Sequence, residues 1–133
     1  MAKLGKQKES SHIAEPMIAL MRSRGWVCHR MPADEILFGV ADWFCYNPEL
    51  KKHAWVEMKR LKPPGFYAKT TEKQRKFFPL QYKAGVPLYV IADYDLRGEA
   101  NYHKRLAHLK RIVDGRPNIM DLLDKERRRY LPC

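Results

Sequence analysis

Two neighbouring stretches near the middle of the chain have the pattern of strands: residues 38–46 are an apolar run interrupted by Asp42, and residues 53–59 end in alternating apolar and charged positions. Aromatic and branched side chains dominate the first stretch, and Asn47-Pro48-Glu49 between the two is typical of a turn. The pattern therefore predicts two adjacent strands joined by a short loop as an antiparallel hairpin.

The alternation also predicts which side chains share a face, because every second residue of a strand points the same way. Trp55, Glu57 and Lys59 lie on one face of the second strand, and Val56 and Met58 point toward the core. On the first strand, Asp42 shares its face with Val40 and Phe44. If the two faces match across the hairpin, we expect Asp42, Glu57 and Lys59 to converge.

Helical spacing and turn residues predict the remaining elements. Ile13, Met17, Leu20 and Met21 recur as on a helix over 11–24, which Ser10 or Ser11 caps and Gly25 ends. Pro79 predicts a kink or an early break in a helix that starts at Thr70 or Thr71 and reaches Ala84. The other predicted elements are strands at 26–30 and 86–92, with Pro87 at a first residue or a sheet edge, and helices at 99–113 and 118–129.

The resulting order of elements is helix, strand, strand, strand, helix, strand, with helical additions at the C-terminal end. This order predicts an α/β fold in which helices flank both sides of one mixed central sheet. The sequence contains no internal repeat and no linker long enough to divide 133 residues into two domains.

Charge changes the picture more than overall composition does. Lys and Arg number 26 against 15 Asp and Glu, which gives a formal net charge of +11. Such an excess attracts nucleic acid, although an anionic membrane surface or general solubility would also account for it. The hydrophobic share of 45% indicates a globular chain, and no apolar run approaches the ~20 residues of a membrane span.

The N-terminus and the cysteines point to a reducing compartment. Residues 1–10 read as a basic arm without the apolar segment of a signal peptide. Cys28, Cys45 and Cys133 are odd in number and widely spaced, so they form neither a disulfide framework nor a zinc pattern. We expect a cytoplasmic protein.

The three converging charged residues allow two interpretations. A Glu57–Lys59 ion pair is the structural one, and it leaves Asp42 unexplained inside an apolar run. The functional one uses all three: carboxylate oxygens bind Mg²⁺, and a neighbouring lysine stabilises developing charge or helps to deprotonate a water.

The ordered context of these residues resembles the PD-(D/E)XK nuclease superfamily, and within it the virus-type replication-repair nuclease (VRR-NUC) and Holliday-junction-resolvase-like group. The resemblance covers roughly Ser11 to Ala92. The matching segments are Ala14-Glu15, Gly39-Val40-Ala41-Asp42, Trp55-Val56-Glu57-Met58-Lys59, Thr70-Thr71-Glu72-Lys73-Gln74 and Ala84-Gly85-Val86-Pro87-Leu88-Tyr89-Val90.

The resemblance implies a restriction-endonuclease-like core and a role for each matching residue. Asp42 and Glu57 match the acidic metal ligands, and the backbone carbonyl of Met58 matches a third. Lys59 matches the lysine that positions or activates the water, and Gln74 matches a glutamine that supports the site. Glu15 matches a first-helix acid that can reach the metal, although a carboxylate near a helix N-terminus also has a purely structural role.

One residue departs from the family pattern, because Ala41 stands where the family name expects proline. That proline shapes the backbone and binds no metal, so its loss is tolerable. Phe66 and Tyr67 either stack on an unpaired base or pack on the core. Several basic residues flank the site in sequence and are candidates for contacts with backbone phosphates: Arg60, Lys62, Lys69, Lys73, Arg75 and Lys76.

As a whole, the resemblance implies a single nuclease domain over 1–133, with an arm at 1–10, a catalytic core at 11–92 and a C-terminal helical segment at 93–133. It implies an Mg²⁺-dependent endonuclease, for which Mn²⁺ substitutes, that cuts branched or otherwise structured DNA in replication, repair or recombination. A bacterial or phage-infected cytosol is the implied location, with the protein at the nucleoid while it acts. It also implies a homodimer; the apolar residues of the C-terminal segment (Ile112, Val113, Met120, Leu122 and Leu123) either pack on the core or form the dimer interface.

Three other functions fit parts of the sequence. A nucleic-acid-binding protein without catalysis explains the charge and needs no metal. A membrane-surface module requires an apolar helix face left free, and 99–113 is the only candidate segment. A zinc nuclease requires paired ligands, but the five histidines are scattered, and His103 and His108 are expected to face solvent.

Overall fold

The computed structural model describes residues 9–32, 39–61 and 71–117, and within them it has the predicted α/β architecture. A π-helical turn, η1 (Ser10–Ala14), leads directly into α2 (Glu15–Ser23). Strands β1 (Val27–Arg30), β2 (Trp43–Asn47) and β3 (Lys52–Arg60) follow, then α4 (Glu72–Lys83) and β4 (Leu88–Asp93). A 3-10 turn, η2 (Glu99–Asn101), and α5 (Tyr102–Val113) complete the described chain.

The four strands form one mixed sheet in the order β1-β2-β3-β4. β2 pairs antiparallel with both β1 and β3, which confirms the predicted central hairpin, and β4 runs parallel to β3 at the sheet edge. Pro87 lies just before this edge strand, where its missing N–H is tolerated.

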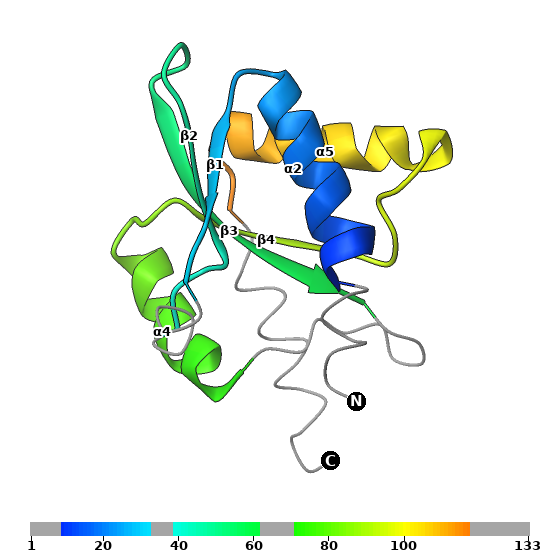
Figure 1. Cartoon of the computed structure of the whole chain (residues 1–133). Coiled ribbons are helices and arrows are strands. Elements are labelled where there is room, and N and C mark those ends of the chain that lie inside the picture. Colours follow the sequence, from blue (N-terminus) through cyan, green and yellow to red (C-terminus); the bar gives the residue numbers. More distant parts are fainter. Residues whose placement is uncertain (1–8, 33–38, 62–70, 118–133) are drawn as a thin grey trace.

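Helices cover both faces of the sheet (Figure 1), as the sequence pattern predicted. On one face, α2 and α5 bury a core that includes Met17, Met21, Val56, Met58 and Ile112. On the other face, α4 packs Phe78 against Ala41, Leu88 and Val90. The alternation along β3 therefore separates two environments, with Val56 and Met58 toward α2 and α5, and Trp55 toward α4.

Three predictions about local structure are wrong in detail. The strand expected at 38–46 begins only at Trp43, because Gly39 has a φ of +80° that a strand does not allow. Of the two outcomes predicted at Pro79, a kink or an early break, the early break does not occur, because α4 continues to Lys83. No serine side chain caps the first helix, which starts with a π-turn instead.

The C-terminal helix is partly as predicted. Leu109 and Ile112 are buried and Val113 packs against the same core, so these residues are used in packing on the sheet. His103 is exposed as expected, but His108 is not: its Nε2 lies 3.3 Å from Asp93 Oδ2 in a half-buried ion pair. The proposed helix at 118–129 and the residues Met120, Leu122 and Leu123 lie outside the described residues.

Cys28 and Cys45 are free thiols that face each other directly across β1 and β2 in the buried layer. Among the described residues, no helix is long and apolar enough to cross a membrane.

Candidate functional site

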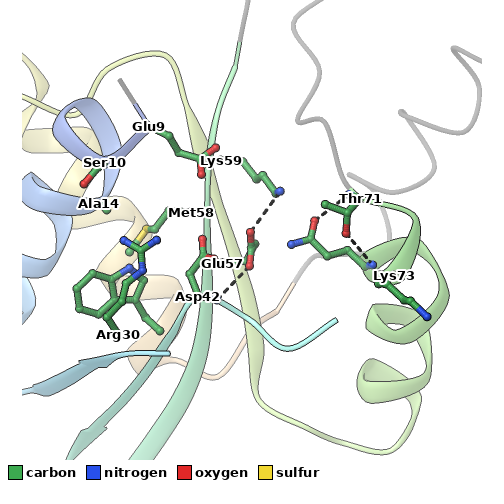
Figure 2. Close-up of a pocket in the computed structure, with 12 residues that line it drawn as sticks. Glu9, Ser10, Ala14, Arg30, Asp42, Glu57, Met58, Lys59, Thr71 and Lys73 are labelled. Carbon is green, nitrogen blue, oxygen red and sulfur yellow. Dashed lines mark hydrogen bonds and ion pairs between the residues drawn. The ribbon is translucent and has the colours of Figure 1, made fainter. Parts of the chain in front are cut away.

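The structure brings Asp42, Glu57 and Lys59 together at the sheet, as the strand alternation predicted (Figure 2). The Asp42 backbone N–H donates to Glu57 Oε1 at 3.1 Å, and Lys59 Nζ lies 3.2 Å from Glu57 Oε2. Each oxygen of Glu57 therefore has one partner. The three residues are 8%, 2% and 7% exposed, so three ionisable groups lie almost wholly inside the protein.

These residues line an open pocket of about 350 Å³. Its walls come from η1, the end of β1, the start of β2, the C-terminal half of β3 and the N-terminal turn of α4. Among the lining residues are Glu9, Arg30, Thr71, Lys73 and Gln74. Residues far apart in the sequence thus converge on a single cavity.

A close contact with α4 holds the segment that carries Asp42. A Cβ placed on Gly39 would meet Phe77 Cδ2 at 2.9 Å and the Lys73 carbonyl at 3.0 Å, so only glycine fits at this approach. Gln81 Nε2 donates to the Gly39 carbonyl at 3.0 Å. Two residues later, Ala41 is fully buried against Phe78, which fixes the start of β2 and the position of Asp42.

Gln74 reaches the pocket from a helix that begins with a complete capping box. Gln74 N–H donates to Thr71 Oγ1 at 3.1 Å, and Thr71 N–H donates to Gln74 Oε1 at 3.0 Å. This arrangement anchors the side chain, which is only 2% exposed, and leaves its amide NH₂ as the donor group at the pocket wall. Gln74 therefore lies where the resemblance placed it.

Glu15 does not reach the pocket. Its side chain is exposed on α2, and the acid that lines the pocket from the N-terminal segment is Glu9. Sequence reasoning assigned Glu9 to a basic arm. Because η1 continues α2 backward by more than a turn, a residue that seemed to precede the fold faces β3 instead.

Burial dominates the electrostatics of the site. Burial, opposed by the Lys59 ammonium and assisted by the Asp42 charge, raises the pKa of Glu57 to about 8. Burial also raises the pKa of Glu9 above its ordinary value; Lys59 and a backbone hydrogen bond from Arg60 act in the opposite direction. A cation in this pocket would favour the charged forms of both carboxylates, which burial disfavours.

Four of the six basic residues predicted to contact phosphates are described. Lys73 lines the pocket and is exposed, and Lys76 is exposed beside the Phe77 ring, 5.3 Å from its centroid. Arg75 is exposed on the same helix. Arg60 is half-buried, and its Nε is buried without a hydrogen-bond partner. Lys62 and Lys69 lie outside the described residues, as do Phe66 and Tyr67.

The oxygen atoms that line the pocket could bind a hard cation such as Mg²⁺ only together with other ligands. In the described part of the chain, no group of three or more His, Cys, Asp or Glu side chains could hold a metal ion as placed. Mg²⁺ does not need such a cage, because it binds through one or two carboxylates and completes its shell with waters and substrate phosphates. Asp42, Glu57 and the adjacent Met58 carbonyl match that requirement, with Glu9 across the pocket.

Comparison of the chain with protein-family models, curated proteins and solved structures finds no match.

Proposed function

We propose that this chain is a metal-dependent endonuclease of the PD-(D/E)XK type that hydrolyses phosphodiester bonds in DNA. The observation that carries the proposal is the convergence of Asp42, Glu57 and Lys59 in one open pocket. Isolated carboxylates and an ammonium are costly to bury. A catalytic role accounts for all three, whereas an ion pair accounts for two.

In this proposal Asp42, Glu57 and the Met58 carbonyl hold Mg²⁺, for which Mn²⁺ substitutes. The bound ion would supply charge neutralisation at the scissile phosphate and a more acidic water. Lys59, held against Glu57, orients the attacking water or stabilises the charge that develops on phosphate oxygen. Gln74 presents its amide to the same cavity, and the exposed Lys73 and Lys76 beside it bind flanking phosphates.

Labelled linear, flapped and four-way DNA incubated with purified protein in Mg²⁺, Mn²⁺ or EDTA tests the proposal. We expect cleavage with either metal and none in EDTA. Asp42→Asn should abolish cleavage, and Asp114→Asn, at an exposed aspartate paired with Lys110 and Arg116, should cut like the wild type. Full activity in EDTA or in Asp42→Asn would disprove the assignment.

The same DNA set tests the finer part of the proposal, a homodimer that prefers branched DNA. A small domain has one such site, and cutting both strands of a junction needs two, most simply related by a twofold axis. Light scattering should then report a dimer. A monomer that cuts linear duplex as well as junctions removes this part and leaves the nuclease proposal standing.

A nucleic-acid-binding protein without catalysis is the second candidate, and one observation favours it. Both oxygens of Glu57 already have partners inside the protein, as a structural ion pair requires. This candidate predicts DNA binding that is unchanged by EDTA, together with no cleavage in any metal.

A further inference from the structure

Five rings lie in contact on one face of the sheet, and we call them the aromatic strip: His29, Phe44, Tyr46, His53 and Trp55. Phe44 is central, with ring centroids 4.7 Å from Trp55, 5.8 Å from Tyr46 and 6.2 Å from His53. His29 joins the strip through Tyr46, at 5.6 Å between centroids and 3.3 Å from its Nε2 to the tyrosine hydroxyl.

Strand register puts these rings together. Phe44 is the Cα partner of both His29 and Trp55, and Tyr46 is the partner of His53. Their immediate neighbours in sequence (Cys28, Cys45, Ala54 and Val56) are buried on the opposite face beneath α2 and α5. The main core beneath α2 and α5 is therefore built by the other side of these strands, and within the strip Trp55 packs against the smaller cluster under α4.

The aromatic strip is largely uncovered by the described helices. α4 is the described helix on this side, and it packs over β3 and β4, where Trp55 meets its cluster. In Figure 1 the β2–β3 hairpin extends well past α4, and its far end carries no helix on that face. His29 and His53 are exposed, Phe44, Tyr46 and Trp55 are half-buried, and the neighbouring Val27 is 37% exposed.

The charges around the strip indicate the chemistry of a partner. The only carboxylate on β1, β2 and β3 is Glu57, which is buried, so no exposed negative charge from these strands borders the rings. Exposed rings without a neighbouring carboxylate, in a chain whose formal net charge is +11, suit a partner with flat π faces and negative charge. Nucleic acid has both, but a duplex hides the faces of its bases inside the stack, so only unpaired nucleotides can offer them.

The aromatic strip also leads to the candidate active site. His53, Trp55, Glu57 and Lys59 are alternate residues of β3 and share one face, so Trp55 and Glu57 are about 7 Å apart along the strand. We propose that the strip binds the unpaired nucleotides of a DNA strand by stacking their bases and directs that strand to the pocket. The proposal rests on the nuclease function and specifies its substrate, DNA with a single-stranded segment.

Binding without cleavage isolates this role. A fluorescent oligothymidylate and a labelled duplex of the same length are titrated with protein in EDTA, and anisotropy reports binding. Tyr46→Ala and His53→Ala should each weaken single-strand binding by about five-fold to a hundred-fold, the scale of losing one base stack. Duplex binding should change little.

Tyr102→Ala is the matched control, because Tyr102 is a 37% exposed tyrosine that lies on α5, away from the strip. It should bind both DNAs like the wild type. Phe44→Leu, which removes a ring while keeping apolar volume, guards against a misfolded alanine variant and should also weaken single-strand binding. Circular dichroism checks each fold.

Wild-type single-strand binding by folded Tyr46→Ala, His53→Ala and Phe44→Leu would overturn the inference, as would an equal loss for both DNAs. The nuclease proposal fails separately. Strip-dependent binding without metal-dependent cleavage would refute the nuclease and keep the strip as a binding surface. Cleavage by a protein whose binding ignores the strip would do the reverse.

Discussion

Glu57 is the residue on which the site's energetics depend. Folding moves its carboxylate from water to a position 2% exposed, beside Asp42 and Lys59. One hydrogen bond and one ion pair compensate only part of the cost of burying the charged form, and the pKa of Glu57 accordingly rises from 4.5 to about 8. A group shifted in this direction makes the fold less stable as it ionises.

The first prediction concerns Glu57→Gln and pH. Between pH 4.5 and about 8 the folded chain keeps a proton on Glu57 that the unfolded chain has released. Wild-type stability should therefore fall as pH rises through this range and level off above it. A glutamine side chain cannot ionise, so the variant should lose this contribution to the pH slope. Each tenfold difference in proton affinity is worth about 1.4 kcal/mol. Across this pH range, the difference in unfolding free energy between the variant and the wild type should therefore change by a few kcal/mol.

Urea titrations in EDTA across this pH range measure the effect. The quantity to compare is the difference in unfolding free energy between variant and wild type, which should shift steadily in favour of Glu57→Gln. A difference that stays constant with pH would mean that Glu57 ionises in the folded protein as easily as in the unfolded chain.

The second prediction separates the two roles open to Lys59. If its ammonium serves the attacking water or the developing charge, Lys59→Met should slow single-turnover cleavage by about 10²-fold or more, the scale of losing one transition-state donor. Binding of DNA should change much less. Lys73→Met is the control, because Lys73 is an exposed lysine of the same pocket and should mainly weaken binding. Weaker binding with unaltered chemistry in Lys59→Met would reduce Lys59 to a phosphate contact.

At the scale of elements, the contact between α4 and the Gly39 segment positions Asp42. The helix is anchored at one end by its capping box, and through Phe77 and Gln81 it holds the chain that leads to Asp42. Glu57 and Lys59 belong to the sheet and need no such support. A disturbance of this contact should therefore move Asp42 while leaving β3 in place.

The third prediction compares two glycines that differ only in their surroundings. Gly39 and Gly85 have φ of +80° and +84°, but a Cβ on Gly85 would meet nothing within 4 Å, whereas one on Gly39 would clash with α4. Gly85→Ala should cost about 1–2 kcal/mol, the strain of a left-handed alanine. Gly39→Ala should cost clearly more and should also reduce cleavage. Thermal unfolding and cleavage assays on both variants test this, and equal losses of stability would show that the close approach is not rigid.

At the scale of the whole molecule, the net charge of +11 should dominate affinity for DNA. Exposed lysines and arginines neutralise phosphates and release counterions, a process that needs neither metal nor catalysis. Binding should therefore survive conditions in which cleavage stops, such as Ca²⁺ in place of Mg²⁺ or the variant Glu57→Gln.

The fourth prediction is that this affinity falls steeply with salt. For duplex DNA, a plot of the logarithm of the binding constant against the logarithm of the salt concentration should have a slope of roughly −0.9 for each phosphate contacted. Removing one exposed lysine, as in Lys76→Ala, should make the slope shallower by about the amount of one phosphate contact. Asp114→Asn should leave the slope unchanged. A flat salt response in the wild type would indicate that the excess charge serves a purpose other than DNA binding.

The sequence by itself determined what depends on near neighbours in the chain. Strand alternation put Glu57 and Lys59 on one face of β3, and the helical periodicity placed the helices, because both patterns repeat within a few residues. The order of elements then determined the α/β class and the central hairpin. Asp42 lies beside Glu57 and Lys59 because it directly precedes β2, and only a short turn separates β2 from β3.

Only the tertiary structure decided what depends on residues distant in the chain. It replaced Glu15 by Glu9 at the pocket, moved the start of the first hairpin strand to Trp43, and placed His108 beside Asp93 instead of in solvent. It also assembled the aromatic strip from three strands. The pairing register of the strands and the packing of helices on the sheet set which of these residues meet, and both depend on segments that are distant in the chain.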